Sequence, residues 1–200
     1  MHILFVCLGN ICRSPTAEGV MRTLAHDAGV AGRVELDSAG TGSWHIGEAP
    51  DERAIAAAKR RGIALSGSAR QVGAEDFERF DLIVAMDRSN LADLERMAPS
   101  PAARARLWLL RDFEAPGGAG RDAGHGGRDV PDPYHGGPAD FDRMVEIVER
   151  ACAGLLDHVA GMLAGEDRVA VGEAGDASAG AFPEAHGGAA ALGSGGGSGR

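Results

Sequence analysis

A cysteine and an arginine near the N-terminus are separated by five residues, within the segment 6–15 that reads Val-Cys-Leu-Gly-Asn-Ile-Cys-Arg-Ser-Pro. A loop of this length can curl round one tetrahedral anion, and Gly9 permits backbone angles that are closed to other residues. Successive backbone N–H groups can then point inward, and Arg13 adds a planar guanidinium that binds two phosphate oxygens. The segment predicts a phosphate-binding loop, residues 8–14, with Leu8, Gly9, Asn10, Ile11, Cys12 and Ser14 around the anion.

The sulfur of Cys7 adjoins this loop. The positive end of a helix beginning at Pro15, together with Arg13, favours an ionised sulfur, and the thiolate is the nucleophilic form of cysteine. Ser14 can donate a hydrogen bond to the sulfur and ease its departure from a phosphocysteine, while Asn10 can brace the loop from behind. A buried cysteine at a strand end is the alternative interpretation, and the Arg-Ser-Pro that follows argues against it.

Attack on an aryl phosphate also requires a proton for the leaving phenolate and later a base that activates water. Asp132, in the segment 130–134 that reads Val-Pro-Asp-Pro-Tyr, is the best candidate because its flanking prolines stiffen the loop. On the residues alone, the alternative that this Asp-Pro is simply a turn stays open.

The other candidate groups have alternative interpretations. Cys12 can form a disulfide with Cys7 under oxidation and protect the thiolate, or it can be a bystander in the loop. Asp87 follows a predicted strand and is interpreted as a helix cap rather than as a site residue. Neither the histidines nor the cysteines show metal-binding spacing, so we expect no metal and no cofactor.

The elements that must position these groups alternate between strands and helices. Residues 2–7 form a buried apolar run, followed by a helix with Ser14 as its N-cap. Further strands are predicted over residues 34–37, 82–86 and 107–110, and further helices over 51–61 and from Ser89, a candidate N-cap, onward. Strands separated by helices form parallel sheets covered on both faces. We therefore predict a single doubly wound α/β domain with a four-stranded parallel sheet.

The last helix has the clearest periodicity. Apolar residues recur there at steps of three and four, at Phe141, Met144, Val145, Val148, Cys152, Leu155, Leu156, Val159 and Leu163. This stripe predicts packing on the sheet, with Cys152 in the core, and a domain over residues 1–164. Residues 165–200 are rich in Gly, Ala and Ser and are predicted to be a disordered tail. The Gly-rich stretch 116–127 is expected to be a mobile surface loop.

Composition limits the possible partners and the compartment. The chain has 200 residues and a net charge of −9, which argues against a general nucleic-acid or anionic-membrane binder. The apolar N-terminal run is too short for a signal peptide, and no run approaches the roughly 20 apolar residues that span a bilayer. Three cysteines do not suggest a disulfide framework. A cytoplasmic location is expected, and the oligomeric state is left open.

Taken together, these residues resemble the low-molecular-weight protein tyrosine phosphatases. The family has Cys, five residues and Arg-Ser near the N-terminus, with Asp-Pro-Tyr a hundred or so residues later, and the match extends through 38–41, 50–53, 69–71 and 85–90. The resemblance implies that Cys7 is the nucleophile, Arg13 the transition-state clamp and Asp132 the general acid and then base. It further implies that Trp44 and Tyr134 are aromatic walls for a phosphotyrosine ring presented by a protein or peptide.

Some positions separate this chain from related patterns. Ile11 fits tyrosine specificity, because related arginine phosphatases carry Thr there; His135 replaces a second aromatic, and Gly67 replaces a histidine often found in the loop-bracing network. A thiol-coupled arsenate reductase is one alternative, but it needs additional cysteines in the middle of the chain, and none lies between Cys12 and Cys152. A non-catalytic phosphotyrosine-binding module is another, and the presence of Cys7 together with Asp132 argues against it.

Overall fold

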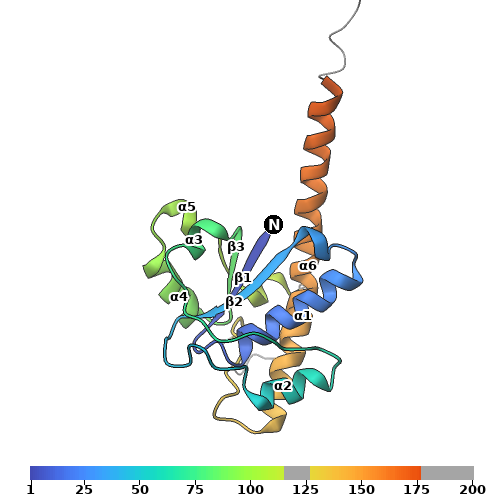
Figure 1. The fold of residues 1–200 in the computed structure, drawn as a ribbon. Helices are drawn as coiled ribbons and strands as arrows, with labels where there is room; N and C mark the ends of the chain where they lie inside the picture. The colour runs from blue at the N-terminus through green and yellow to red at the C-terminus, as the bar shows by residue number, and fades with distance from the viewer. Residues whose placement is uncertain (115–126, 177–200) are drawn as a thin grey trace, which may run out of the picture. The chain divides into compact units, whose positions relative to one another are not determined.

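A four-stranded parallel sheet in the order β2-β1-β3-β4 forms the centre of the protein (Figure 1). The structure is a computed structural model that describes residues 1–114 and 127–176. The strands are β1 (His2–Cys7), β2 (Glu35–Gly40), β3 (Leu82–Ala85) and β4 (Leu107–Leu109). The predicted four-stranded parallel sheet is thereby confirmed, and β1, the strand that ends at the candidate nucleophile, lies between β2 and β3.

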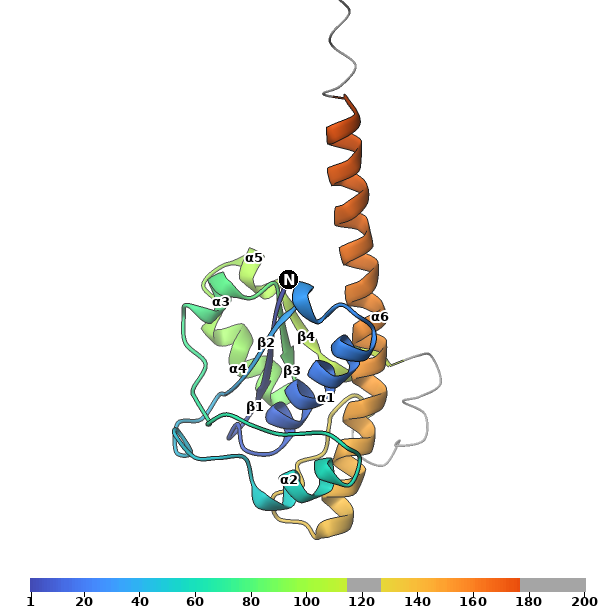
Figure 2. The same cartoon turned by 45° about the vertical axis from the view of Figure 1, so that its right-hand side comes forward.

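Helices cover both faces of this sheet, as the doubly wound prediction requires. Helix α1 and the first part of α6 lie on one side, and α3, α4 and α5 lie on the other (Figure 1, Figure 2). The helices are α1 (Arg13–Asp27), α2 (Glu52–Lys59), α3 (Asp76–Arg79), α4 (Arg88–Met97), α5 (Pro101–Arg104) and α6 (Pro138–Asp176), with 3-10 turns η1 (Ala31–Arg33) and η2 (Leu110–Phe113).

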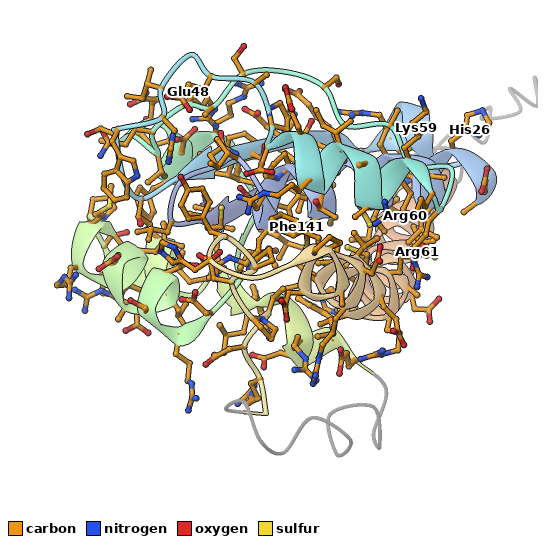
Figure 3. All side chains as sticks on the ribbon, turned by 90° about the horizontal axis from the view of Figure 1, so that it is seen from below. His26, Glu48, Lys59, Arg60, Arg61 and Phe141 are labelled. Carbon is orange, nitrogen blue, oxygen red and sulfur yellow. The ribbon has the colours of Figure 1, made fainter. Side chains whose placement is uncertain are left out.

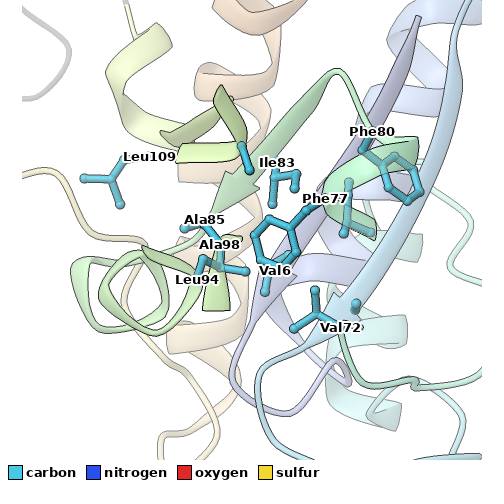
Figure 4. Packing of buried hydrophobic residues seen from close by; sticks show 12 residues of the cluster. Val6, Val72, Phe77, Phe80, Ile83, Ala85, Leu94, Ala98 and Leu109 are labelled. Carbon is cyan, nitrogen blue, oxygen red and sulfur yellow. The ribbon is translucent and has the colours of Figure 1, made fainter. Parts of the chain in front are cut away.

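The core on the α3–α5 side follows from the alternation of side chains along β1. Leu4 and Val6 point to that side and pack with a cluster that includes Phe77, Phe80 and Leu94 (Figure 4). Each of these five side chains is buried. This apolar layer holds β1 against the neighbouring helices and so fixes where the strand ends.

On the other face, α1 and α6 pack together. Ile3 and Phe5 are buried there, and the sulfur of Cys152 lies 3.8 Å from the backbone carbonyl of Ala17. The predicted place of Cys152 in the core is confirmed, and burial raises the pKa of its thiol. The predicted stripe on α6 is also buried from Phe141 to Val159, except that Leu156 is partly exposed.

Ion pairs join α2 to α6 on the surface. Arg60 and Arg61 lie at the end of α2 (Figure 3), where Arg60 pairs with Asp142 and Arg61 pairs with Glu149 at 2.5 Å. These contacts join the start of α6 to the end of α2. The segment that precedes α6, residues 129–137, is bonded to the carboxyl end of the sheet, where the backbone N–H of Val130 donates to the carbonyl of Met86.

Several predicted boundaries differ from the structure. The strand predicted over residues 34–37 runs from Glu35 to Gly40. Ser14 is not the N-cap of α1, because the helix begins at Arg13 and the Ser14 hydroxyl lies against the Cys7 sulfur. Ser89 is not the cap of α4 either, since the Asp87 carboxylate accepts from the backbone N–H of Asn90 at 2.7 Å. Helix α6 continues to Asp176, so residues 165–176 of the predicted disordered tail are helical; the domain end at residue 164 stays a prediction.

The remainder of the predicted tail, residues 177–200, lies outside the described residues, and so does the predicted Gly-rich loop apart from Gly127. Among the helices that the structure describes, none has both the length and the apolar character needed to cross a bilayer.

Gly154 of α6 gives a stability prediction. A Cβ at this position would lie 1.9 Å from the backbone carbonyl oxygen of Phe113, so the backbone must shift to accept it. We expect Gly154→Ala to lower the free energy of unfolding by about 2 kcal/mol or more, despite the better helix propensity of alanine. Gly161→Ala, on the same helix with open space around it, is the control and should be neutral or stabilising. Urea denaturation of both variants checks this; equal stabilities would contradict it.

Candidate active site

The loop between β1 and α1 curves tightly round the sulfur of Cys7. Asn10, not Gly9, takes the left-handed backbone conformation, with φ of 56°. The prediction that Gly9 supplies the unusual backbone angle is therefore wrong. Gly9 instead permits a close approach, because a Cβ there would lie 3.0 Å from the ring of His45.

Hydrogen-bond donors surround the sulfur of Cys7. The backbone N–H of Asn10 donates to it at 3.2 Å, and the hydroxyl of Ser14 lies 3.0 Å away. Helix α1 starts at Arg13, so its positive end faces the same point. The loop donors and the helix end together make an environment that can bind an anion.

Asn10 connects the loop to the strands behind it. Its side-chain amide donates to the hydroxyls of Ser14 and Ser38, both at 3.0 Å, and its side-chain oxygen accepts from the backbone N–H of Arg70 at 2.9 Å. The guanidinium of Arg70 is in turn fixed by two carboxylates, Asp37 and Asp76. The loop is thus held by a network that reaches β2 and the residues before α3.

Arg13 is buried, with only 3% of its side chain exposed, and it is held between two carboxylates. One terminal nitrogen donates to Asp87 at 2.5 Å and to the carbonyl of Val130 at 3.3 Å, and the other donates to Asp132 at 2.7 Å. Burial alone would lower the pKa of Arg13, but Cys7, Asp132 and Asp87 together hold it above its ordinary value. The guanidinium therefore stays charged beside the sulfur.

Asp87 is the predicted helix cap, and in the structure it also binds Arg13. One carboxylate oxygen caps α4, and the other accepts from the Arg13 guanidinium. Its position directly after β3 was the available signal, because the carboxyl ends of adjacent parallel strands converge at one edge of the sheet.

Asp132 lies over the loop, with 42% of its side chain exposed. The segment that carries it is anchored by the backbone N–H of Val130, which donates to Met86 at the end of β3 at 2.8 Å. The carboxylate oxygen of Asp132 that does not bind Arg13 accepts from the backbone N–H of Tyr134 at 3.1 Å. The structure therefore brings Asp132 to Cys7 and Arg13 across more than a hundred residues.

A pocket of about 220 Å³ opens above these groups. Its rim carries the two predicted aromatic residues, Trp44 and Tyr134, and also two histidines, His45 and His135. The rings of His45 and Tyr134 have centroids 6.2 Å apart. The full lining comprises Cys7, Leu8, Gly9, Ile11, Cys12, Arg13, Trp44, His45, Asp132, Tyr134 and His135. Sequence reasoning did not assign His45 to the site, although it directly follows Trp44.

Arg53 of α2 supports this rim. The residue belongs to the segment 50–53 that resembles the family, but the sequence assigns it no function. Its guanidinium donates to the backbone carbonyl of Tyr134 at 3.0 Å and lies 5.5 Å from the centre of the Tyr134 ring. Hydrogen bonds to Asp51 hold the pKa of Arg53 above its ordinary value. The segment that carries Asp132 and Tyr134 is therefore tied to the start of α2.

Cys12 lies in the same loop and lines the pocket. All three cysteines are free thiols in the structure, so the disulfide between Cys7 and Cys12 stays a prediction. Burial, and then the nearby carboxylate of Asp51 and the sulfur of Cys7, raise the pKa of Cys12 to about 12. Cys12 is thus a protonated thiol at neutral pH.

Comparison with known proteins matches this arrangement to one family. A sequence model described as "Low molecular weight phosphotyrosine protein phosphatase" matches residues 2–164. The low molecular weight protein-tyrosine-phosphatase of Streptomyces coelicolor is 47% identical over 155 residues, which is 78% of this chain and 91% of the relative.

Two solved structures support the match. A protein tyrosine phosphatase from Entamoeba histolytica superposes with a TM-score of 0.74 at 37% identity, over 80% of this chain and 97% of that one. A Drosophila arginine phosphatase superposes with a TM-score of 0.70 at 33% identity, over 80% and 98%. The chain belongs to the low molecular weight phosphotyrosine protein phosphatase family.

Proposed function

We propose that this protein is a protein tyrosine phosphatase that hydrolyses phosphotyrosine in proteins or peptides through a cysteinyl-phosphate intermediate. One observation carries the proposal: the Cys7 sulfur, the Arg13 guanidinium and the Asp132 carboxyl group all line a single pocket. A nucleophile, a cation for the phosphoryl oxygens and a proton donor are what a two-step phosphoryl transfer needs.

In the first step, the thiolate of Cys7 attacks phosphorus and the ester P–O bond breaks. Asp132 gives its proton to the departing phenolate oxygen, while Arg13 and the N–H groups of the loop bind the other phosphoryl oxygens. Phosphotyrosine is thereby converted to tyrosine and phosphocysteine, and Asp132 is left as a carboxylate.

In the second step, Asp132 takes a proton from water as the water oxygen attacks phosphorus. The S–P bond breaks, inorganic phosphate forms, and the sulfur leaves as a thiolate. The hydroxyl of Ser14, 3.0 Å from that sulfur, stabilises it by donating a hydrogen bond. Each group thus returns to its starting state.

Preference for phosphotyrosine is proposed from the shape of the pocket. Trp44 and Tyr134 flank a pocket that has Cys7 among its lining residues, so a long aromatic phosphate ester can reach the sulfur while the shorter phosphoserine cannot. Ile11 lines the same pocket and adds apolar surface. Phosphoarginine is the competing substrate class, because a structurally similar relative is described as an arginine phosphatase.

A panel of peptides of one sequence, carrying phosphotyrosine, phosphoserine or phosphoarginine, tests this proposal. We expect release of phosphate from the phosphotyrosine peptide only, and none with Cys7→Ser. Preferred hydrolysis of the phosphoarginine peptide would show that the protein is an arginine phosphatase instead. Thiol consumption with arsenate, without phosphate release, would indicate an arsenate reductase. Tight binding of the phosphotyrosine peptide without turnover would indicate a binding module.

A cytoplasmic location is also proposed. The mechanism needs a reduced Cys7 thiol, and the cytoplasm is kept reducing by its thiol systems. The three free cysteines are compatible with such a compartment. Fractionation of the source cells with an antibody against the protein would test this location.

The double role of Asp87 gives a prediction for catalysis. Asp87→Asn keeps an oxygen that can cap α4 but removes the charge that orients Arg13. A charge-assisted hydrogen bond contributes about 1.5–3 kcal/mol, so we expect kcat/KM to fall by about 10- to 100-fold. Asp93→Asn removes a carboxylate from the same helix, where it pairs with Arg96, and should leave kcat/KM unchanged. Similar rates for both variants would refute an orienting role for Asp87.

A further inference from the structure

A chain of hydrogen bonds leads from the sulfur of Cys7 to a carboxylate on the side of α1. The sulfur lies 3.0 Å from the hydroxyl of Ser14, which lies 3.0 Å from the side-chain nitrogen of Asn10. The same nitrogen lies 3.0 Å from the hydroxyl of Ser38, which lies 2.7 Å from a carboxylate oxygen of Glu18. Glu18 is thus connected to the nucleophile through three intervening side chains.

The donors and acceptors in this chain can be ordered because each group has a fixed number of hydrogens. A carboxylate can only accept, so the single hydroxyl hydrogen of Ser38 points to Glu18. The Ser38 oxygen is then free to accept one hydrogen from the amide of Asn10. The backbone N–H of Arg70 donates to the Asn10 side-chain oxygen, which fixes the orientation of the amide from its other end.

This order decides where the hydrogen of Ser14 points. The Ser14 oxygen accepts the second hydrogen of the Asn10 amide, so its own hydrogen must be donated elsewhere. Two acceptors are within reach: the Cys7 sulfur at 3.0 Å and the carbonyl of Ala39 at 3.3 Å. The shorter contact leads to the charged sulfur, which is the stronger acceptor. Ser14 therefore donates to the thiolate as long as Asn10 donates to Ser14.

Glu18 is largely buried, so its contacts are mainly with protein groups rather than with solvent. Its side chain is 12% exposed, and its other oxygen accepts from Arg22. Together with Ser38, Asn10 and Gly67 it lines a second cavity of about 250 Å³, separate from the substrate pocket. A buried carboxylate that accepts from a buried hydroxyl sets the direction of that hydroxyl firmly.

We infer that Glu18 is a positioning residue for catalysis, which orders the hydrogen bonds of Ser38, Asn10 and Ser14 so that Ser14 donates to the Cys7 sulfur. The inference rests on the proposed phosphatase function. Without the Glu18 acceptor, the Ser38 hydrogen turns toward Asn10, where it opposes the amide hydrogens. The amide then shifts, and Ser14 no longer has a single preferred acceptor.

The step most affected is the second one, in which the sulfur leaves phosphorus. We expect Glu18→Ala to lower kcat for p-nitrophenyl phosphate by about tenfold, with a smaller change in kcat/KM. The reason is that kcat/KM depends only on the steps up to the release of nitrophenol, which precede hydrolysis of the phosphocysteine. Phosphoenzyme then accumulates, so a burst of nitrophenol precedes the steady state. A merely structural role would lower the amount of active enzyme and leave the burst per active molecule at the wild-type level.

Four further variants sharpen the test. Ser38→Ala breaks the same chain and should give the same burst, and the double variant with Glu18→Ala should be no slower than either single variant. Glu18→Gln keeps a neutral acceptor and should lower kcat by a smaller factor, about threefold. Arg22→Gln is the control, since it removes the contact to the other Glu18 oxygen and should leave kcat unchanged. If Glu18→Ala does not fold, Ser38→Ala and Glu18→Gln carry the test.

One readout does not depend on phosphatase activity. Iodoacetate alkylates the thiolate, so the ratio of alkylation rates at about pH 6 and about pH 9 reports how well the loop stabilises the charged sulfur. We expect this ratio to fall severalfold in Glu18→Ala and Ser38→Ala but not in Arg22→Gln. An unchanged ratio with no burst overturns the role of Glu18, whereas a changed ratio in a protein without phosphatase activity overturns the proposed function alone.

Discussion

Cys7→Ser is expected to lower the turnover of aryl phosphates by about 10⁴-fold or more. A serine hydroxyl at this position lacks the charge that attacks phosphorus, and the two groups that bond to the Cys7 sulfur, the backbone N–H of Asn10 and the hydroxyl of Ser14, cannot act as a base for it. The anion site should survive, because the loop N–H groups and Arg13 do not depend on the sulfur. Steady-state kinetics, together with calorimetric titration of inorganic phosphate, measure the two properties separately.

The control for this variant is Cys152→Ala, which removes a thiol from the core, away from the pocket. We expect its activity per folded molecule to match that of the wild type. Iodoacetate should label Cys7 alone at neutral pH, because burial keeps Cys12, with a pKa of about 12, protonated. Turnover by Cys7→Ser within tenfold of wild type, or labelling of Cys12 before Cys7, would contradict the assignment of the nucleophile.

Asp132→Asn is expected to have the second largest effect. The amide keeps the size of the side chain and an oxygen for the backbone N–H of Tyr134, but it has no proton to give to the phenolate. Loss of a general acid costs about 10²- to 10⁴-fold in rate. The loss should be largest for phosphotyrosine, whose phenolate needs the proton, and smaller for p-nitrophenyl phosphate, whose nitrophenolate leaves without help.

This dependence on the leaving group separates an acid from a residue that only supports Arg13. A supporting residue would slow all esters by the same factor, because each contacts the guanidinium in the same way. Asp129→Asn is the matched control: it removes a carboxylate from the same segment, where it pairs with Arg88, and should slow no substrate. A uniform loss across esters in Asp132→Asn would disprove the role of general acid.

The fold was predictable from the sequence because its signals are local. The apolar run of β1 and the periodic stripe along α6 can each be recognised within one segment, and four apolar strands separated by helices allow few topologies. The candidate nucleophile and its loop were also readable, because Cys7 and Arg13 lie within one short segment.

The errors arose where tertiary hydrogen bonds override a local rule. Ser14 before a proline is a typical helix cap, yet its hydroxyl is used by Cys7 and Asn10 instead. Glycine is the usual residue for a left-handed conformation, yet Asn10 takes it, since asparagine tolerates that region and its amide is held on both sides. Tertiary hydrogen bonds, which the sequence does not display, decided both cases.

The second carboxylate at Arg13 and the support of Arg53 could not be predicted for a different reason. Asp87 and Arg53 meet Arg13 and Tyr134 only after the chain has folded. Their contacts span 74 and 81 residues, and no local pattern encodes them. For Asp87, topology offered a partial signal, because it follows a strand adjacent to the one that ends at Cys7.

The bond between Arg13 and Asp132 has a consequence for the order of events in the mechanism we propose. The nitrogen that binds Asp132 in the free enzyme is among the groups that must turn to a phosphoryl oxygen when an ester arrives. The phosphate ester and Asp132 therefore compete for the same Arg13 nitrogen. Binding of the phosphoryl group releases the carboxyl group of Asp132 from Arg13. Without substrate, the carboxyl group of Asp132 thus occupies the position on Arg13 that a phosphoryl oxygen takes when the ester binds.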